Sequence, residues 1–415
     1  MERYAFYANQ IRQEIHRHPE IGYDLCNTLA IIRRELTAMG IPYTERFGKS
    51  SIVATINPEK AGFTIGIRAD MDALPIQEQT QAEYASTIDG VMHACGHDVH
   101  TSILLATAKK LRDMQEQIDC CVKLLFTPAE EYAPPGCQLM AEDGVMEDID
   151  CVVSCHVDPN FPVGSVAIDE GGQGGNSLGF TLEFFGENAH AAYQHRGKDA
   201  ITMAVQAYTA LEMLVAKEID PVEPCLLNIG AFNGGHTNNI ICDYCSMYGT
   251  LRTHSDEVND YLCRRISQIA EGIAAMHGGR SRFTVKKFLP AVINDAVITQ
   301  RMYHAAATLL GEENIHHKKR TLTGEDFSYL CRRKPGMMFR LGTNGGERTA
   351  YPIHNPRFDV DPDCFAVGID MFVQFVLENM SGNGLLDIAP TIADIMGVPV
   401  PREWEGKSVV KKMEE

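Results

Sequence analysis

The chain has 415 residues, of which 45% are hydrophobic and 22% charged, a length that exceeds one ordinary core and predicts two domains. Its net charge of −18 argues against a nucleic-acid partner, whose phosphates attract a positive surface. The sequence contains no apolar run that is long enough to span a membrane, so neither a membrane span nor a membrane partner is expected. The N-terminus lacks the pattern of a secretory signal, so a cytoplasmic location is expected.

The first part of the chain alternates between helical and strand patterns. Residues 9–39 show helical periodicity that is broken at 18–22, and residues 100–114 form a second helical stretch. Four short apolar runs each end in a polar cluster, at 63–72, 120–131, 150–159 and 336–346. This alternation predicts an α/β fold with a mostly parallel sheet, whose ligands bind beyond the carboxyl ends of the strands.

The middle of the chain has a different order of elements. It predicts strand, helix, two strands, helix and strand, at 178–186, 198–217, 224–232, 240–253, 256–277 and 281–288. This order is that of a ferredoxin-like α+β unit, inserted into the first domain. We therefore expect a first domain in two parts, at 1–175 and 289–380, a second domain inserted at 176–288, and a C-terminal packing extension at 381–415.

The stretch "MHACGHDVHT", residues 92–101, is dense in metal-binding side chains. A loop at a strand end can turn both Cys95 and His97 inward, whereas a helix would separate them. A thiolate and an imidazole suit zinc, manganese, cobalt or nickel, and the soft sulfur favours zinc. His93 and His100 are interpreted as packed or capping residues, and most of the 13 cysteines as buried thiols.

Further candidate donors follow the other apolar runs. Glu130 and Glu131 are adjacent, so one can bind metal while the other acts as general base toward a water. Asp70 and Asp72 are turn-capping residues or carboxylates that orient the ligands. Two histidines beside prolines complete a set that is large enough for two divalent ions: Cys95, His97, Glu131, His156 and His354.

Six motifs stand in the order found in the M20 metallopeptidase family: "RADMDALPIQE", "HACGHDVHT", "FTPAEE", "GTLRT", "GEDFSYL" and "HNPRFDVDPD". Over roughly residues 8–380 the chain resembles the amidohydrolase branch of this family, which includes aminoacylase-like, hippurate and indole-acetyl-amino-acid hydrolases. The resemblance implies that the five donors bind two metals and that Glu130 is the base. It also implies that the domain in two parts, 1–175 and 289–380, is catalytic, and that the inserted domain at 176–288 is a lid through which two copies of the chain form a homodimer.

The resemblance assigns three further residues of the lid. His190, in "HAA", stabilises the oxyanion and often acts in the partner subunit's site, while Asn239 and Arg252 contact the substrate. Arg252 suits a carboxylate, to which it can donate two hydrogen bonds. The usual residues are replaced at Gln194 and Cys242, so the lid specifies the substrate less clearly than the donors specify the chemistry.

These patterns predict a hydrolase that cleaves the amide bond of an N-acyl or N-aroyl amino acid. The expected cofactors are two divalent ions per subunit, with zinc or manganese favoured over cobalt or nickel. Glu130 is the catalytic base, with His190 and Asp72 as further catalytic residues. A dipeptidase or carboxypeptidase, or a deaminase of an aromatic amine, is the alternative that uses the same ions. An inactive metal-binding protein is a rival interpretation, but such a protein has no need of Glu130 beside the ligands. Phosphoester hydrolysis is another rival, suggested only by the tail at 381–415, and that activity would survive the loss of Cys95.

Overall fold

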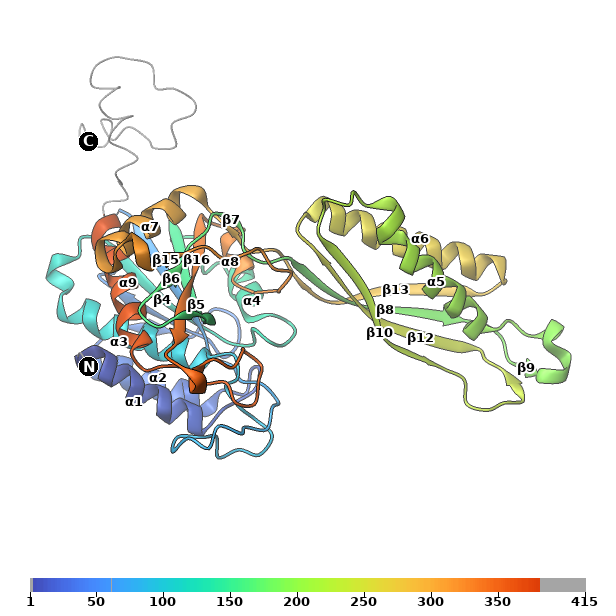
Figure 1. Cartoon of the computed structure of the whole chain (residues 1–415), viewed down its shortest axis with the longest axis horizontal. Helices are drawn as coiled ribbons and strands as arrows, with labels where there is room; N and C mark the ends of the chain where they lie inside the picture. Colours follow the sequence, from blue (N-terminus) through green and yellow to red (C-terminus); the bar gives the residue numbers. More distant parts are fainter. Residues whose placement is uncertain (1–2, 61, 381–415) are drawn as a thin grey trace, which may run out of the picture. The chain divides into compact units, whose positions relative to one another are not determined.

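The computed structural model describes residues 3–60 and 62–380, so the predicted extension at 381–415 lies outside the described residues. The chain divides into two compact units. Among the described residues, the larger unit contains those up to Gly171, Ile293–Lys319 and those from Tyr329 to Met380; the smaller contains Gly172–Val292 and Arg320–Ser328. In the smaller unit, the Gly175 N–H donates to Thr323 O (3.0 Å). Figure 1 shows the elements of both units.

A central sheet organises the larger unit, with the strand order β1-β2-β4-β3-β5-β16-β6-β15. Strand β3 runs parallel to β4 and β5, and β16 runs parallel to β5, which makes the centre of the sheet parallel as predicted. Every residue of β3 is buried, as expected of a strand covered on both faces. The strands are β1 (Tyr43–Thr44), β2 (Ile52–Ile56), β3 (Thr64–Asp70), β4 (Cys121–Thr127), β5 (Cys151–Pro162), β6 (Val166–Ala167), β15 (Ile315–His316) and β16 (Gly336–Asn344).

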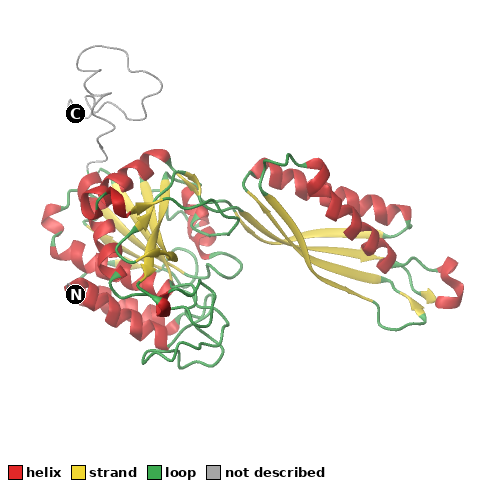
Figure 2. Ribbon diagram, viewed as in Figure 1, coloured by secondary structure: helices red, strands yellow, loops and turns green. Residues whose placement is uncertain are grey.

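Helices cover this sheet (Figure 2). α3 (His97–Asp113) packs against α1 (Arg3–Arg17), α9 (Cys364–Asn379) and β3, and their apolar side chains form one core. α2 (Cys26–Met39) ends at Gly40, whose left-handed conformation (φ 64°) satisfies the last carbonyls of the helix. Further elements are the helices α4 (Gly136–Glu142), α7 (Ala296–Leu310) and α8 (Ser328–Cys331) and the short strands β7 (Gly171–Gly172) and β14 (Ile293–Asn294).

One boundary in the larger unit differs from the sequence prediction. The helix that was expected from residue 100 begins at His97, so His97 lies in a helix and not in a loop. Gly96 makes this possible because it adopts φ 83°, which turns the chain sharply into the helix directly after Cys95. Cys95 and His97 thus stand on either side of a left-handed residue, and the argument that a helix would separate them does not apply.

The smaller unit contains a four-stranded antiparallel sheet with the order β10-β12-β8-β13 and two helices. Its elements are β8 (Asn176–Phe185), α5 (Ala200–Glu218), β10 (Cys225–Gly234), β12 (Tyr244–Thr253), α6 (Asp256–Met276) and β13 (Arg280–Leu289), the order and arrangement of a ferredoxin-like unit. Asp199 and Ser255 cap the two helices through their side-chain oxygens.

The strand expected at 240–253 is divided in the structure. Its beginning, β11 (Ile240–Ile241), pairs with β9 (Ala189–His190), and the chain then passes Cys242 to form β12. Among the described residues, none of the helices is long and apolar enough to cross a membrane.

Candidate metal centre

The five predicted metal donors converge in the larger unit. Ligand atoms of Cys95, His97 and His156 lie within 4.8 Å of one another, and so do those of Cys95, Glu131 and His354. The Cys95 Sγ is 3.6 Å from His156 Nε2, and His354 Nε2 is 3.1 Å from Glu131 Oε1. Cys95 belongs to both groups, so the five residues form one continuous cluster.

Parallel strand order explains this convergence. Asp70 and Asp72 follow β3, Glu130 and Glu131 follow β4, and His156 lies in β5. Because these three strands are neighbours and parallel, their carboxyl ends meet at one edge of the sheet.

Two backbone features bring in the remaining donors. A side chain at Gly96 would place its Cβ 2.5 Å from Val157 Cγ2, so only glycine lets the turn between Cys95 and His97 approach β5 this closely. His354 has a left-handed backbone (φ 63°), and its N–H donates to Ala94 O at 2.7 Å. This hydrogen bond holds the His354 loop beside Cys95.

His156 is arranged as a neutral ligand. Its Nδ1–H donates to Val157 O (2.8 Å), which leaves Nε2 free to face Cys95. Burial, and then the nearby Arg340, lower the pKa of His156 well below its usual value. The neutral imidazole that results is the form that binds a metal ion.

His97 and Cys95 fit a divalent cation. Both ring nitrogens of His97 are buried and lack a hydrogen-bond partner in the described part of the chain, an arrangement that is costly unless something else binds them. Burial raises the pKa of the Cys95 thiol, so the thiolate needs a cation beside it. A metal ion would satisfy both requirements, with the carboxylate of Glu131 adding the negative charge that such ions prefer.

Asp72 positions the two glutamates. It is buried, accepts hydrogen bonds from the Glu130 N–H (3.0 Å) and the Glu131 N–H (3.2 Å), and lies 3.5 Å from His97 Nδ1. Glu130 itself is buried, and its carboxylate lies within 4.8 Å of ligand atoms of His97 and Glu131. The Asp72 carboxylate thus binds the backbone N–H of Glu130 and holds this residue beside the donors.

Arg68 and His100 support the cluster, a role that the sequence analysis did not assign to them. Burial would raise the pKa of Asp70, but Arg68 (2.7 Å), His97 and His100 (2.6 Å) lower it well below its usual value. The opposite nitrogen of His100, Nε2, accepts the Val157 N–H at 3.0 Å. His100 therefore connects β3 to the residue that follows His156. The sequence offered one sign of this role, because His100 follows His97 by three residues, a spacing that puts both side chains on one face of a helix.

The other three predicted site residues belong to the smaller unit. His190 is exposed in β9, its Nδ1 accepts the Ala192 N–H (3.1 Å), and the Ala191 N–H donates to Asn239 O (3.0 Å). Arg252 is half-buried in β12 and donates to Thr250 Oγ1 at 3.2 Å. It pairs with no carboxylate among the described residues, and its role, like those of His190 and Asn239, stays a prediction.

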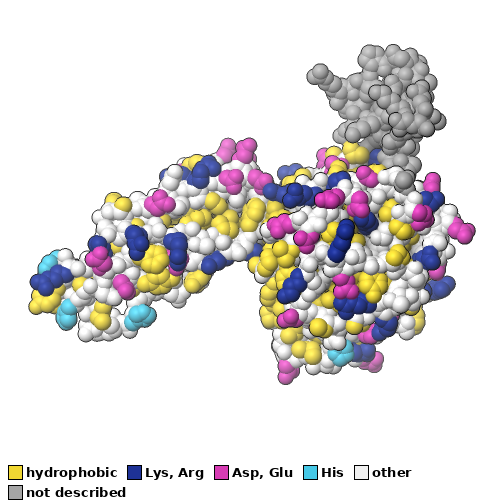
Figure 3. Space-filling view, turned by 180° about the vertical axis from the view of Figure 1, so that it is seen from behind, with side chains coloured by type: hydrophobic (Ala, Val, Ile, Leu, Met, Phe, Trp, Pro, Cys, Tyr) yellow, Lys and Arg dark blue, Asp and Glu magenta, His cyan; other side chains and the backbone are white. Residues whose placement is uncertain are grey.

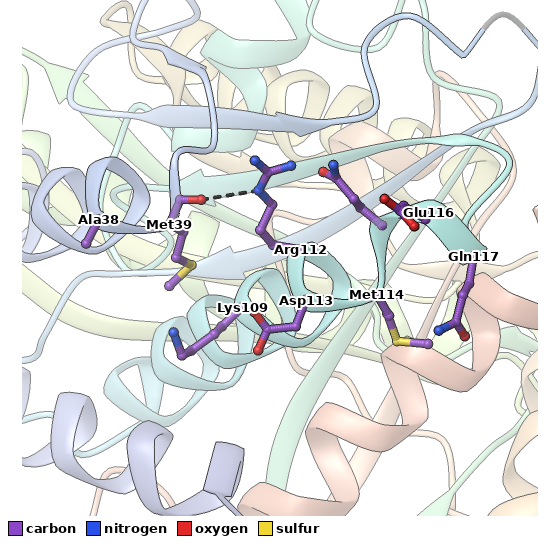
Figure 4. A pocket seen from close by; sticks show the side chains of 9 residues that line it. Ala38, Met39, Lys109, Arg112, Asp113, Met114, Glu116 and Gln117 are labelled. Carbon is purple, nitrogen blue, oxygen red and sulfur yellow. Dashed lines mark hydrogen bonds between the residues drawn. The ribbon is translucent and has the colours of Figure 1, made fainter.

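A separate cavity of about 510 Å³ lies where α2 and α3 end. Figure 4 shows its lining, in which the Arg112 Nε donates to Met39 O at 3.2 Å. Its other charged residues are Lys109, Asp113 and Glu116. None of the five metal donors lines this cavity, so it is not the metal centre.

Comparison with known proteins agrees with this geometry. The model of the protein family described as "Peptidase family M20/M25/M40" matches residues 66–378 of this chain. An N-acetylcysteine deacetylase of Bacillus subtilis is 32% identical over 90% of this chain and 97% of its own. Thermostable carboxypeptidase 1 of Saccharolobus solfataricus is also 32% identical, over 86% of this chain and 92% of its own. The crystal structure of the Bacillus subtilis YXEP protein, a dinuclear metal-binding peptidase, superposes with a TM-score of 0.77 at 31% identity, covering 90% of this chain and 98% of its own.

Proposed function

Since this chain belongs to peptidase family M20/M25/M40 and is a hydrolase of amide bonds, we propose that it cleaves N-acyl or N-aroyl amino acids. The position of Glu130 carries the proposal. A carboxylate that lies within 4.8 Å of two donors, and that is held there by Asp72, is placed to take a proton from a water and not only to bind an ion.

We assign the roles as follows. Cys95, His97, Glu131, His156 and His354 would hold two divalent ions. When bound, such ions polarise the scissile carbonyl and lower the pKa of water. Glu130 accepts the proton of the attacking water and delivers it to the departing amine. Asp72 keeps Glu130 in position. We assign the developing oxyanion to His190 and the substrate's carboxylate to Arg252, with Asn239 as a further contact to the substrate.

A Glu130→Gln variant tests the role of the base. The amide keeps the size of the side chain but cannot take up a proton, so we expect kcat to fall by ~10²- to 10⁴-fold while the metal content stays that of the wild type. Glu116→Gln, on an exposed residue of the same unit, is the matched control and should keep full activity. A Glu130→Gln variant with bound metal and the full wild-type rate would contradict the mechanism.

The substrate class needs a screen of its own. The full-length protein, supplied with zinc, manganese or cobalt, is incubated with acyl-amino acids, dipeptides and aminoaromatic compounds, and the products are identified by mass spectrometry. Release of an amino acid together with a carboxylic acid supports the proposal. The likeness to a carboxypeptidase favours peptides as the second candidate, whose cleavage would appear in the same screen. Release of ammonia would instead indicate a deaminase.

The assembly that we propose is a homodimer formed by the smaller unit. Strand β10 lies at the edge of its sheet and has one paired neighbour, β12, among the described residues. Its Leu226 and Phe232 are exposed, as are Val205, Tyr208 and Met213 of α5. Figure 3 shows hydrophobic side chains on the visible face of this unit. Exposed apolar groups beside an unpaired strand edge favour association with a second copy.

A further inference from the structure

Three arginines are buried among the described residues, and one of them differs from the other two. Arg12 donates to the carboxylates of Asp98 (2.7 Å) and Asp359 (3.0 Å). Arg68 donates to Asp70 at 2.7 Å. Arg340, which is 9% exposed, makes no hydrogen bond or ion pair to any described residue. The larger unit thus neutralises two of its buried guanidinium groups, while the third has no partner in the part of the chain that the structure describes.

Arg340 lies directly beside the donor cluster. In the parallel pair of β16 and β5, its register partner is His156, and neighbouring strands are about 4.8 Å apart. Partners in register point to the same face of a sheet. Phe339 and Leu341 belong to the apolar core, so Arg340 points to the other face, together with His156.

A second cation, Lys318, lies near Arg340. On its other side Arg340 is in register with Ala167 of β6, which in turn pairs with His316, two residues before Lys318. Burial, and then Arg340, lower the pKa of the Lys318 ammonium group, in agreement with this proximity.

Nearby carboxylates are already engaged. Asp158 lies 3.3 Å from Lys318 Nζ and also accepts the Asn160 N–H (3.0 Å) and side-chain amide (2.7 Å). Asp169 lies 2.8 Å from His317 Nδ1 and accepts the Lys318 N–H at 2.7 Å. These contacts provide Lys318 with a counter-charge, but they leave Arg340 without one.

A buried guanidinium stays charged at any ordinary pH, and burying a charge without a partner is costly. Methionine or leucine would fill the same space without this cost. An anion that arrives from outside the chain removes the cost when it binds, and the planar fork of an arginine matches a carboxylate with two hydrogen bonds.

We propose that Arg340, assisted by Lys318, forms a subsite for a second carboxylate of the substrate, beside His156. The inference rests on the proposed function and narrows it: the preferred substrates are N-acyl amino acids with an additional carboxylate. That carboxylate terminates either the acyl group or the side chain of the amino acid. Arg252 remains assigned to the α-carboxylate.

Two pairs of substrates distinguish the two positions of the charge. N-succinyl-L-leucine is compared with N-butyryl-L-leucine for the acyl group, and N-acetyl-L-glutamate with N-acetyl-L-glutamine for the amino acid. We expect the manganese-loaded wild-type protein to prefer the charged member of one pair by about tenfold or more in kcat/KM, the value of one charge-assisted hydrogen bond. The pair that shows the preference identifies the half of the substrate that Arg340 binds.

Arg340→Met should abolish this preference. The preference is measured as the ratio of kcat/KM within each pair, because Arg340 lies in register with His156 and a general effect of its loss changes the kcat/KM of both members together. Arg340→Lys, which keeps the charge but loses the fork, should restore part of the preference. Arg33→Met is the matched control, because Arg33 lies on the surface of α2 and pairs with Glu45 at 2.7 Å. The proposal is wrong if the Met variant keeps the wild-type ratio in both pairs, or if the wild type prefers neither charged substrate.

Product binding tests the subsite without turnover. Isothermal titration of the same proteins compares succinate with butyrate and glutamate with glutamine, and the Met variant should lose the tighter binding of the charged product. If the wild type cleaves none of the four substrates, the proposed function fails, and this titration still decides whether the subsite exists. Since Arg340→Met removes an unpaired buried charge, it should melt at the wild-type temperature or above. A large fall would mean that the guanidinium stabilises the chain as it stands, which would contradict the argument.

Discussion

His16 connects the N-terminal helix to the start of α3. Its Nδ1 is 2.7 Å from Asp98 Oδ2, and its Nε2 is 3.3 Å from Glu78 Oε1. Burial and then Arg12 lower the pKa of His16, but Asp98 and Glu78 outweigh them, so that the net shift is upward. Asp98 directly follows His97, which makes this buried network part of what holds a metal donor in place.

The raised pKa predicts a pH dependence of stability. The stabilisation from protonated His16 is fully present below its unfolded pKa of about 6.5 and is lost as the pH rises through the higher folded value, at about 1.4 kcal/mol per pH unit. Urea unfolding of the metal-free protein at several pH values measures the loss. His97 also has a raised pKa. The difference between wild type and His16→Gln therefore isolates His16, with the exposed His18→Gln as control. Parallel curves for wild type and His16→Gln would contradict the assignment.

Single residues differ in how far the sequence could predict them. The five donors and Glu130 carry distinctive chemistry next to strand ends, and the structure brings them together. Arg68 and Arg340 could not be assigned in this way, and for His100 the sequence offered only its spacing of three from His97. Their roles depend on which side chains neighbouring strands place beside them, and the same residues in another register would be ordinary core or surface groups.

Among the elements, the turn at Gly96 is the most sensitive. Gly96→Ala would combine a left-handed backbone with a Cβ contact of 2.5 Å, so we expect a loss of about 2 to 5 kcal/mol in the free energy of unfolding and weaker metal binding. Gly164→Ala is the matched control, since Gly164 also has a positive φ (90°) but open space where the Cβ would lie. It should lose only about 1 kcal/mol. Urea unfolding of both variants decides, and equal losses would show that packing against Val157 is not the cause.

Element types were predictable where the periodicity was strong, and element boundaries were less so. The alternating runs predicted the parallel centre of the sheet, because buried strands are apolar throughout and helices between them are amphipathic. The start of α3 and the division of the strand at 240–253 were missed. The first depends on the conformation of Gly96, and the second on β11 pairing with β9 instead of continuing into β12.

At the scale of the whole molecule, the proposed homodimer makes a prediction about shared sites. If His190 acts in the partner subunit's site, dimers that combine one His190→Ala chain with one Glu130→Gln chain contain one intact site. Co-expression of the two variants should restore about a quarter of the wild-type activity, since half of the randomly formed dimers are mixed. Differently tagged chains allow the mixed dimers to be isolated and assayed. Activity no higher than that of either variant alone would count against a shared site.

Metal stoichiometry tests the central claim, that five donors of the larger unit bind a pair of divalent ions. The full-length protein is equilibrated with zinc or manganese, dialysed, and analysed by inductively coupled plasma mass spectrometry. We predict two ions per wild-type chain, the same number for the control His18→Gln, and a clear loss for His97→Ala. A wild-type chain that retains no ion, or a His97→Ala chain that retains both, would contradict the account.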